Sequence, residues 1–248
     1  HDPDIACLEA MRFPPESSFC DRAWGLQRLM RLDPGNAAVW LAAAERAAQD
    51  GDMAAFDEYL HLAAQAGHYD SRYGMSLQRL TDLLASAPLP PRSPQAEQAL
   101  RRMARMDSGQ ALSSADLATL LAAMYGQSPM DLPAVASAYR LCQPPLPASR
   151  RSDCAGASTH MANGDLLLVR ILGTRQMVNL SAGTPANRQW RERLRKEKWL
   201  LSSMWKFPGA SSPDNLRAVW QLGEVPALQA WLKANGQAAR PRPASLVA

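Results

Sequence analysis

Apolar residues recur every three or four positions along most of the chain, which is the spacing of one face of an α-helix. Residues 37–49 are the clearest case, because Val39, Ala43 and Ala47 fall on one face. No segment alternates convincingly between apolar and polar residues, so we expect no β-sheet. The pattern predicts an all-α protein of about 12 helices.

Turn signals set the boundaries of these helices. Pro34 and Gly35 cannot both continue a helix, and Asn36 is a good N-cap for the helix that follows. Gly51 and Asp52 end that helix and start the next one. Together, periodicity and turns predict helices over 3–11, 18–32, 37–49, 53–64, 70–84, 93–106, 113–124, 132–141, 152–161, 165–178, 185–205, 214–222 and 225–235.

The proline-rich segment 88–94 is the point at which the chain could divide. We interpret it as a loop within one superhelix, with a subdivision there as the alternative. Residues 1–236 are therefore predicted to form a single helical repeat-like domain. Residues 237–248 are predicted to be a disordered tail.

The stretch 32–66 resembles a tetratricopeptide-type helical hairpin. The matching positions are Leu32-Asp33-Pro34, Trp40, Ala44, Gly51-Asp52, Phe56, Leu60 and Ala63. The chain departs from the family pattern at Ala47, where tyrosine is common, at Phe56, where alanine is common, and at His68, where proline is common. The resemblance implies a superhelix of antiparallel helical hairpins, a tetratricopeptide-like α-solenoid.

Such a superhelix has a concave groove, which is lined by the inner helix of each hairpin and which binds peptides or protein loops. In this hairpin the inner helix would be 37–49. We expect Ala38, Leu41, Glu45 and Ala48 to be exposed on it. Leu41 and Glu45 are therefore candidate partner-binding residues.

The four cysteines fall into two local pairs, each of which brackets a proline-bearing loop. Three connectivities are formally possible, and we favour Cys7–Cys20 and Cys142–Cys154 because local closure fits both loops. Each bridge would stabilise the fold by about 3 kcal/mol in the chain-entropy model. The alternative is four free, buried cysteines in a cytosolic protein.

Two disulfides would place the protein in an oxidising compartment. Of the 27 basic residues, 23 are arginine, which with the abundant alanine is associated with GC-rich bacterial genomes. The chain begins with His1 rather than methionine, and we expect that a signal peptide has been removed. The predicted location is the periplasm or the outside of the cell.

Charge is unevenly distributed, since residues 1–100 hold 8 basic and 14 acidic side chains and residues 101–248 hold 19 and 9. A polarised surface would steer a charged partner, although uneven solvated faces give the same count. The most basic helix, 185–205, offers Arg188, Arg191, Arg195 and Lys198 as candidate partner-binding residues. The alternative is an amphipathic helix that buries its tryptophans and leaves its arginines in water.

Catalytic and cofactor motifs are missing from the chain. Glycine-rich phosphate loops and Gly-x-Ser-x-Gly do not occur, and the histidines His1, His61, His68 and His160 are scattered. We nominate no catalytic residue, no cofactor and no metal ligand. No apolar run reaches the roughly 20 residues needed to span a bilayer, so no membrane span is expected.

These features predict a periplasmic or secreted protein-binding module or scaffold without catalytic activity. Its partner would be another protein or a peptide, and we do not expect nucleic acid. One alternative is an immunity protein that neutralises a secreted toxin in the bacterial envelope. A second alternative is a hydrolase that acts on cell-wall material.

Thiol counting tests the cysteine prediction. We expect no free thiol in the denatured, unreduced protein, and peptide mapping should recover the bridges Cys7–Cys20 and Cys142–Cys154. Four free thiols would contradict the prediction and remove the main reason for an exported location.

Overall fold

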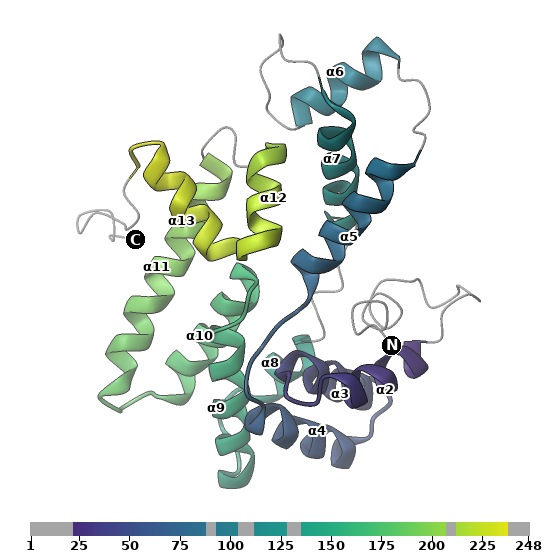
Figure 1. The fold of residues 1–248 in the computed structure, drawn as a ribbon. Helices are drawn as coiled ribbons and strands as arrows, with labels where there is room; N and C mark the ends of the chain where they lie inside the picture. The colour runs from purple at the N-terminus through teal and green to yellow at the C-terminus, as the bar shows by residue number, and fades with distance from the viewer. Residues whose placement is uncertain (1–21, 88–92, 104–111, 128–134, 207–211, 238–248) are drawn as a thin grey trace. The chain divides into compact units, whose positions relative to one another are not determined.

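The computed structural model describes residues 22–87, 93–103, 112–127, 135–206 and 212–237, and within these ranges every regular element is an α-helix (Figure 1). The helices are α2 (Arg22–Leu32), α3 (Ala37–Gln49), α4 (Met53–Gln65), α5 (Tyr73–Ser86), α6 (Pro94–Met103), α7 (Ser114–Gln127), α8 (Ala136–Leu141), α9 (Ala148–Ala162), α10 (Leu167–Leu180), α11 (Ala186–Lys206), α12 (Pro213–Leu222) and α13 (Glu224–Ala234). The predicted all-α class is therefore confirmed for the described ranges.

Most predicted helices lie within a few residues of the observed ones. The clearest difference is α9, which begins at Ala148, directly after Pro147, rather than at Ser152. Pro147 has an extended backbone and ends the proline loop, so the helix can start at once. The predicted helix 3–11 lies outside the described residues, as do residues 238–248 of the predicted tail 237–248 and most of the 88–94 segment.

The chain forms two compact units, each made of two separate stretches. Unit 1 takes residues 1–72 and 131–197, and unit 2 takes residues 73–130 and 198–248. The divisions fall at 72/73, 130/131 and 197/198, so none coincides with segment 88–94. The single domain predicted over 1–236 stays a prediction.

The predicted hairpin is present in unit 1 as α3 and α4. The side-chain oxygen of Asn36 accepts from Ala38 N at 3.0 Å, and that of Asp52 accepts from Ala55 N at 3.0 Å. Both predicted helix starts are thus capped. Gly51 sits between the helices with φ +78°, a left-handed conformation that favours glycine.

The expected exposure of Leu41 on the inner helix is wrong. Leu41 is 0% exposed and Ala38 is 4% exposed, and α3 packs against α8 and α9 from the second stretch of unit 1 as well as against α2 and α4. Glu45 accepts hydrogen bonds from Ser137 N at 2.6 Å and Ser137 Oγ at 3.0 Å. Its carboxylate therefore accepts a backbone N–H in the first turn of α8, which has no intrahelical partner.

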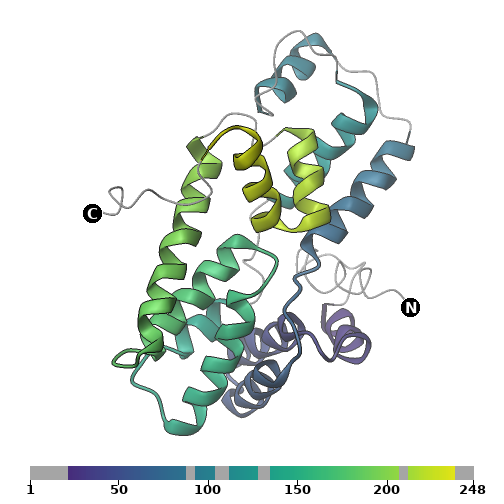
Figure 2. The same ribbon diagram turned by 60° about the vertical axis from the view of Figure 1, so that its left-hand side comes forward.

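Helices α4, α9 and α10 lie side by side at close range (Figure 1, Figure 2). A Cβ on Gly156 would lie 2.7 Å from Ala64 Cβ, and one on Gly173 would lie 2.5 Å from Ala162 N. Only glycine permits these approaches without a shift of the backbone. The α4–α9 contact also carries an ion pair, Arg150–Asp57 at 2.7 Å, and a hydrogen bond between His61 Nδ1 and Asp153 at 3.0 Å.

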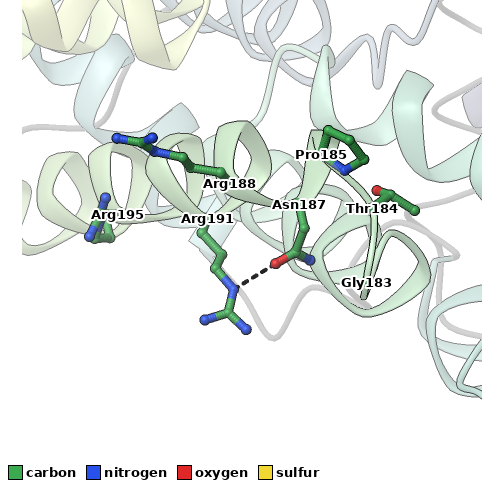
Figure 3. A pocket seen from close by; sticks show the side chains of 7 residues that line it. All are labelled: Gly183, Thr184, Pro185, Asn187, Arg188, Arg191 and Arg195. Carbon is green, nitrogen blue, oxygen red and sulfur yellow. Dashed lines mark hydrogen bonds between the residues drawn. The ribbon is translucent and has the colours of Figure 1, made fainter.

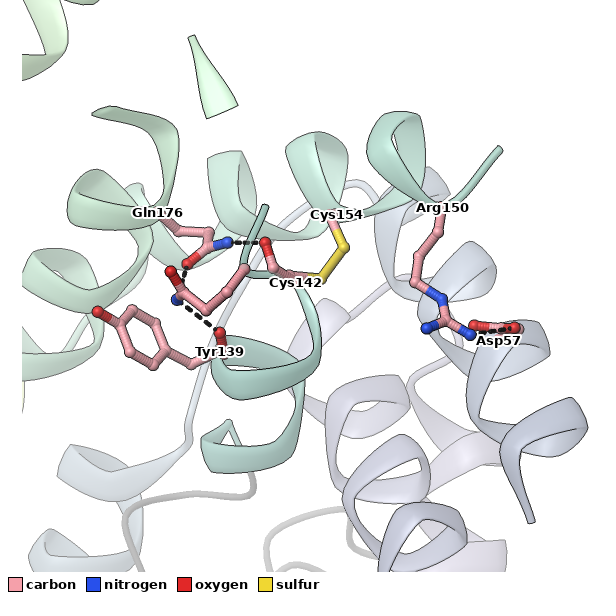
Figure 4. Close-up of a disulfide and its surroundings, with 7 residues drawn as sticks. Asp57, Tyr139, Cys142, Arg150, Cys154 and Gln176 are labelled. Carbon is pink, nitrogen blue, oxygen red and sulfur yellow. Dashed lines mark hydrogen bonds and ion pairs between the residues drawn. A yellow bond between two sulfur atoms is a disulfide. The ribbon is translucent and has the colours of Figure 1, made fainter. Parts of the chain in front are cut away.

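A disulfide joins the end of α8 to α9 (Figure 4). The Cα atoms of Cys142 and Cys154 are 5.6 Å apart, and both residues are buried. Gln176 of α10 donates to the carbonyl oxygen of Cys142, so α10 also contacts the disulfide-linked end of α8. The predicted Cys142–Cys154 pair is present, whereas Cys7 and Cys20 lie outside the described residues.

Unit 2 has its own core between α5, α7 and α12. Leu77, Ala122 and Trp220 are buried together there. A Cβ on Gly74 would lie 2.6 Å from Trp220 O, so α5 and α12 touch through their backbones. Arg217 of α12 reaches Asp116 of α7 at 3.0 Å, which adds an ion pair between two of these helices.

A buried polar cluster fixes the start of α3. Asn36 is 0% exposed, and its Nδ2 donates to Asp33 Oδ2 at 2.9 Å and to Asp70 O at 2.8 Å. Its Oδ1 accepts from Asp70 N at 3.0 Å as well as from Ala38 N. One amide therefore joins the two ends of the α3–α4 hairpin.

Replacing Asn36 should lower the free energy of unfolding much more than replacing an ordinary N-cap residue does. Asn36→Ala leaves buried partners without hydrogen bonds, and we expect a loss of about 2–4 kcal/mol in the free energy of unfolding. Asp52→Ala removes one exposed cap bond and should cost about 1 kcal/mol. Urea denaturation monitored by circular dichroism measures both, and equal losses would refute the special role of Asn36.

The environment of Asp33 predicts that the free energy of unfolding depends on pH. Burial raises the pKa of Asp33, but hydrogen bonds from Arg72 and Asn36 and the charge of Arg72 together outweigh burial, so the pKa lies below its ordinary value. A lowered folded-state pKa contributes stability above the unfolded pKa of about 3.9, and this stability is lost as the pH falls through the folded value.

Asp33→Asn should therefore lower the free energy of unfolding at neutral pH, and its difference from the wild type should shrink as the pH falls from about 5 toward 2. The exposed Glu58→Gln is the control and should stay within about 0.5 kcal/mol of the wild type at neutral pH. A difference for Asp33→Asn that is constant across this pH range would contradict the ion-pair account.

Candidate partner-binding site on helix α11

The site forms where α10 ends and α11 begins. Thr184 N donates to Ser181 O at 3.0 Å, and Asn187 N donates to Thr184 O at 3.1 Å, so a tight turn precedes α11. Gly183 has φ +80° in this turn. The side chain of Asn187 donates to Val178 O at 2.7 Å, which ties the first turn of α11 to the end of α10.

An open pocket of about 670 Å³ lies at this turn (Figure 3). Its lining residues are Gly183, Thr184, Pro185, Asn187, Arg188, Arg191 and Arg195. The three arginines are spaced three and four residues apart, so they share one face of α11. We call these seven residues the arginine pocket.

The three guanidinium groups differ in their partners. Arg188 is exposed and has no hydrogen bond or ion pair within the described part of the chain. Arg191 Nε donates to Asn187 Oδ1 at 2.8 Å, which orients the group without neutralising its charge. Arg195 pairs with Glu192, which also lies 3.5 Å from Lys196 Nζ.

The pocket therefore keeps a positive charge. Residues 183–197 hold five basic and two acidic side chains. The hydrogen bond from Arg195 lowers the pKa of Glu192, and the charges of Arg195 and Lys196 lower it further. Glu192 is thus ionised at neutral pH, and it is shared between Arg195 and Lys196.

A buried ion cluster holds the opposite side of α11 in place. Glu197 is 3% exposed and lies 2.9 Å from Arg193 Nε and 3.5 Å from Arg170 Nε. Arg193 also donates to Ala162 O and to Asn163 Oδ1, the latter at 3.0 Å, at the end of α9. Because these contacts fix the rotation of α11, they determine which face shows Arg188, Arg191 and Arg195.

The same cluster depends on Arg170. Burial lowers the pKa of Arg170, while the charge of Glu197 acts against this shift. Arg170 Nη1 also donates to Gly164 O at 3.3 Å. The one acid and the two bases of the cluster thus hold α9, α10 and α11 together and are not available to a partner.

The six predicted partner-binding residues lie in different environments. Arg188, Arg191 and Arg195 line one pocket. Lys198 is exposed but belongs to unit 2 and does not line it. Leu41 is buried and Glu45 is bound to Ser137, as described above. A partner-binding role for any of them stays a prediction.

Sequence reasoning missed Asn187, Thr184 and Gly183. Asn187 precedes Arg191 by four residues, which is the spacing of neighbours on a helix, so its contact could have been anticipated. The turn that places Thr184 and Gly183 beside the arginines has no comparable signal, because its geometry depends on how α10 meets α11.

Other chemical groupings in the described ranges are sparse. No three His, Cys, Asp or Glu side chains gather there as a metal site would require. His61 is bonded through Nδ1 to Asp153 and through Nε2 to Gln65 Nε2 at 2.7 Å, so both ring nitrogens have partners. Among the described helices, none has the length and apolar character needed to cross a bilayer.

No protein-family model, curated protein or solved structure matches the chain. The likeness of residues 32–66 to a tetratricopeptide hairpin therefore gains no support from relatives. Function must be inferred from the residues themselves, and the arginine pocket is the feature that offers most to a ligand.

Proposed function

We propose that this protein is a binding module without catalytic activity, and that its arginine pocket docks an acidic segment of another protein. The observation that carries the proposal is the gathering of three exposed arginines on one face of α11 around an open pocket. Only Arg195 among them has an acidic partner in the described residues.

Guanidinium groups suit carboxylates because two parallel N–H groups match the two carboxylate oxygens. An open pocket also leaves room for a polypeptide to pass across it, which a closed cavity does not. A single exposed ion pair is worth only about 0–1 kcal/mol. Several arginines must therefore act together, and the affinity should depend strongly on salt.

The charge distribution favours a protein over a nucleic acid. Nucleic-acid surfaces need basic side chains along an extended track of phosphates. Here Arg193 and Arg170 are taken up by Glu197, which leaves a compact patch rather than a track. A short run of aspartate or glutamate fits such a patch better.

The proposal includes a location and a repeat type. The Cys142–Cys154 bridge supports an oxidising compartment, and we propose the bacterial periplasm or the extracellular space. The α3–α4 hairpin with its capped helices supports a tetratricopeptide-like α-solenoid. The burial of Leu41 moves the proposed binding surface from the inner helix of that hairpin to α11.

Fluorescence anisotropy with a fluorescein-labelled glutamate-rich peptide tests the proposal. We expect the wild-type protein to bind at about 0.05 M salt and to lose at least tenfold in affinity at about 0.3 M. The triple variant Arg188→Glu, Arg191→Glu, Arg195→Glu should abolish binding, because it reverses the charge of the pocket.

The matched control is Arg31→Glu, Arg102→Glu, Arg151→Glu, which makes the same charge change at three exposed arginines elsewhere. It should keep most of the affinity. Equal losses in the two triple variants would show that only net charge matters. Tighter binding of labelled duplex DNA than of the peptide would replace the proposed partner with nucleic acid.

A further inference from the structure

We infer that Arg191 is the anchor of the arginine pocket, that it grips one carboxylate of the acidic segment through both Nη atoms, and that Asn187 positions it to do so. This inference rests on the proposed function. It names the group that dominates recognition and the ligand chemistry that the group takes, which is a single side-chain carboxylate.

Arg191 is prepared for a two-point contact. Its Nε is occupied by Asn187 Oδ1 at 2.8 Å, and within the described residues its two Nη atoms have no partner. Figure 3 shows the guanidinium extended from α11 beside the Asn187 oxygen. Those two nitrogens are the pair that a carboxylate accepts from end-on.

Asn187 is itself locked in place. Its Nδ2 donates to Val178 O at 2.7 Å and to Ser181 Oγ at 3.2 Å, which leaves Oδ1 to face Arg191. Because both of these bonds reach the end of α10, the direction of the Arg191 side chain is set by the turn between α10 and α11. An aspartate at this position could accept from Arg191 but would cancel its charge and would lack the N–H donor that bonds Val178 O.

The other two arginines lack this combination. Arg188 has no partner in the described part of the chain, so it must lose side-chain entropy when a ligand binds. Arg195 is already paired with Glu192, so a ligand must compete with that carboxylate. Arg191 is therefore the one lining arginine that is oriented by a hydrogen bond and is not paired with an acid in the described residues.

Single substitutions in the full-length protein test the ranking, with the fluorescein-labelled glutamate-rich peptide as the probe. Arg191→Ala should weaken binding about tenfold, whereas Arg188→Ala should weaken it about threefold or less. Arg191→Lys keeps the charge but not the two-point contact, so it should lose nearly as much as Arg191→Ala. Arg31→Ala, at an exposed site on α2, is the control and should change little.

A double-mutant cycle separates positioning from general damage. Asn187→Ala should weaken binding about threefold to fivefold in the wild-type background and should have no further effect when Arg191 is already alanine. A residue that merely held the fold together would weaken binding in both backgrounds. Thermal unfolding of each variant verifies that the protein is folded when the affinity is measured.

The outcomes distinguish this inference from the proposed function. If the wild-type protein fails to bind the peptide, the proposed function is wrong and this inference falls with it. If the wild type binds but Arg188→Ala and Arg191→Ala lose equally, or Arg191→Lys binds normally, the acidic-segment function stands and the anchor role of Arg191 is overturned. Additive effects of Asn187→Ala and Arg191→Ala overturn the positioning role.

Discussion

The buried amide of Asn36 is the contact on which unit 1 depends. An amide removed from water must replace every hydrogen bond that it loses, and Asn36 does so with Asp33, with Ala38 and twice with Asp70. Two of these partners, Asp33 and Asp70, lie on opposite sides of the α3–α4 hairpin in the chain. The hairpin can therefore close in only one register, and Ala37 N donates to His68 O at 2.8 Å beside it.

The segment Asp70–Arg72 links the hairpin to other parts of unit 1. Asp70 bonds Asn36, Arg72 pairs with Asp33 at 2.7 Å, and Ser71 N donates to Asp165 Oδ1 at 2.9 Å in the turn between α9 and α10. Burial raises the pKa of Asp165, and the hydrogen bonds from Ser71 oppose but do not cancel that shift. The N-terminal hairpin and the later α9–α10 pair are joined by polar contacts as well as by apolar packing.

Contacts near this turn also hold α11 in position. The carbonyl groups at the end of α9 receive Arg193 and Arg170, and both share the buried Glu197. Burying such ions is costly, and removal of one member leaves an uncompensated charge. The cluster therefore fixes the rotation of α11 strictly, and the arginines on the other face of the helix point to solvent as a consequence.

Local sequence determined the helices and their ends. Apolar periodicity and the turn residues Pro34-Gly35 and Gly51-Asp52 act over a few positions, so the hairpin and its caps could be predicted without knowledge of the rest of the chain. The spacing of Arg188, Arg191 and Arg195 on one helical face, and the local pairing of Cys142 with Cys154, were visible for the same reason.

Exposure and partnership were decided only by the tertiary structure. Leu41 was expected to face solvent on the inner helix of the hairpin, but it is fully buried in unit 1, where α3 also packs against α8 and α9 from the second stretch of the chain. Glu45 accepts hydrogen bonds from Ser137, Arg193 donates to the end of α9, and Arg170 of α10 reaches Glu197 of α11, although in the sequence these residues look like ordinary surface charges. Helical periodicity depends on neighbours within a turn or two, whereas burial and ion pairing depend on segments that only folding brings together.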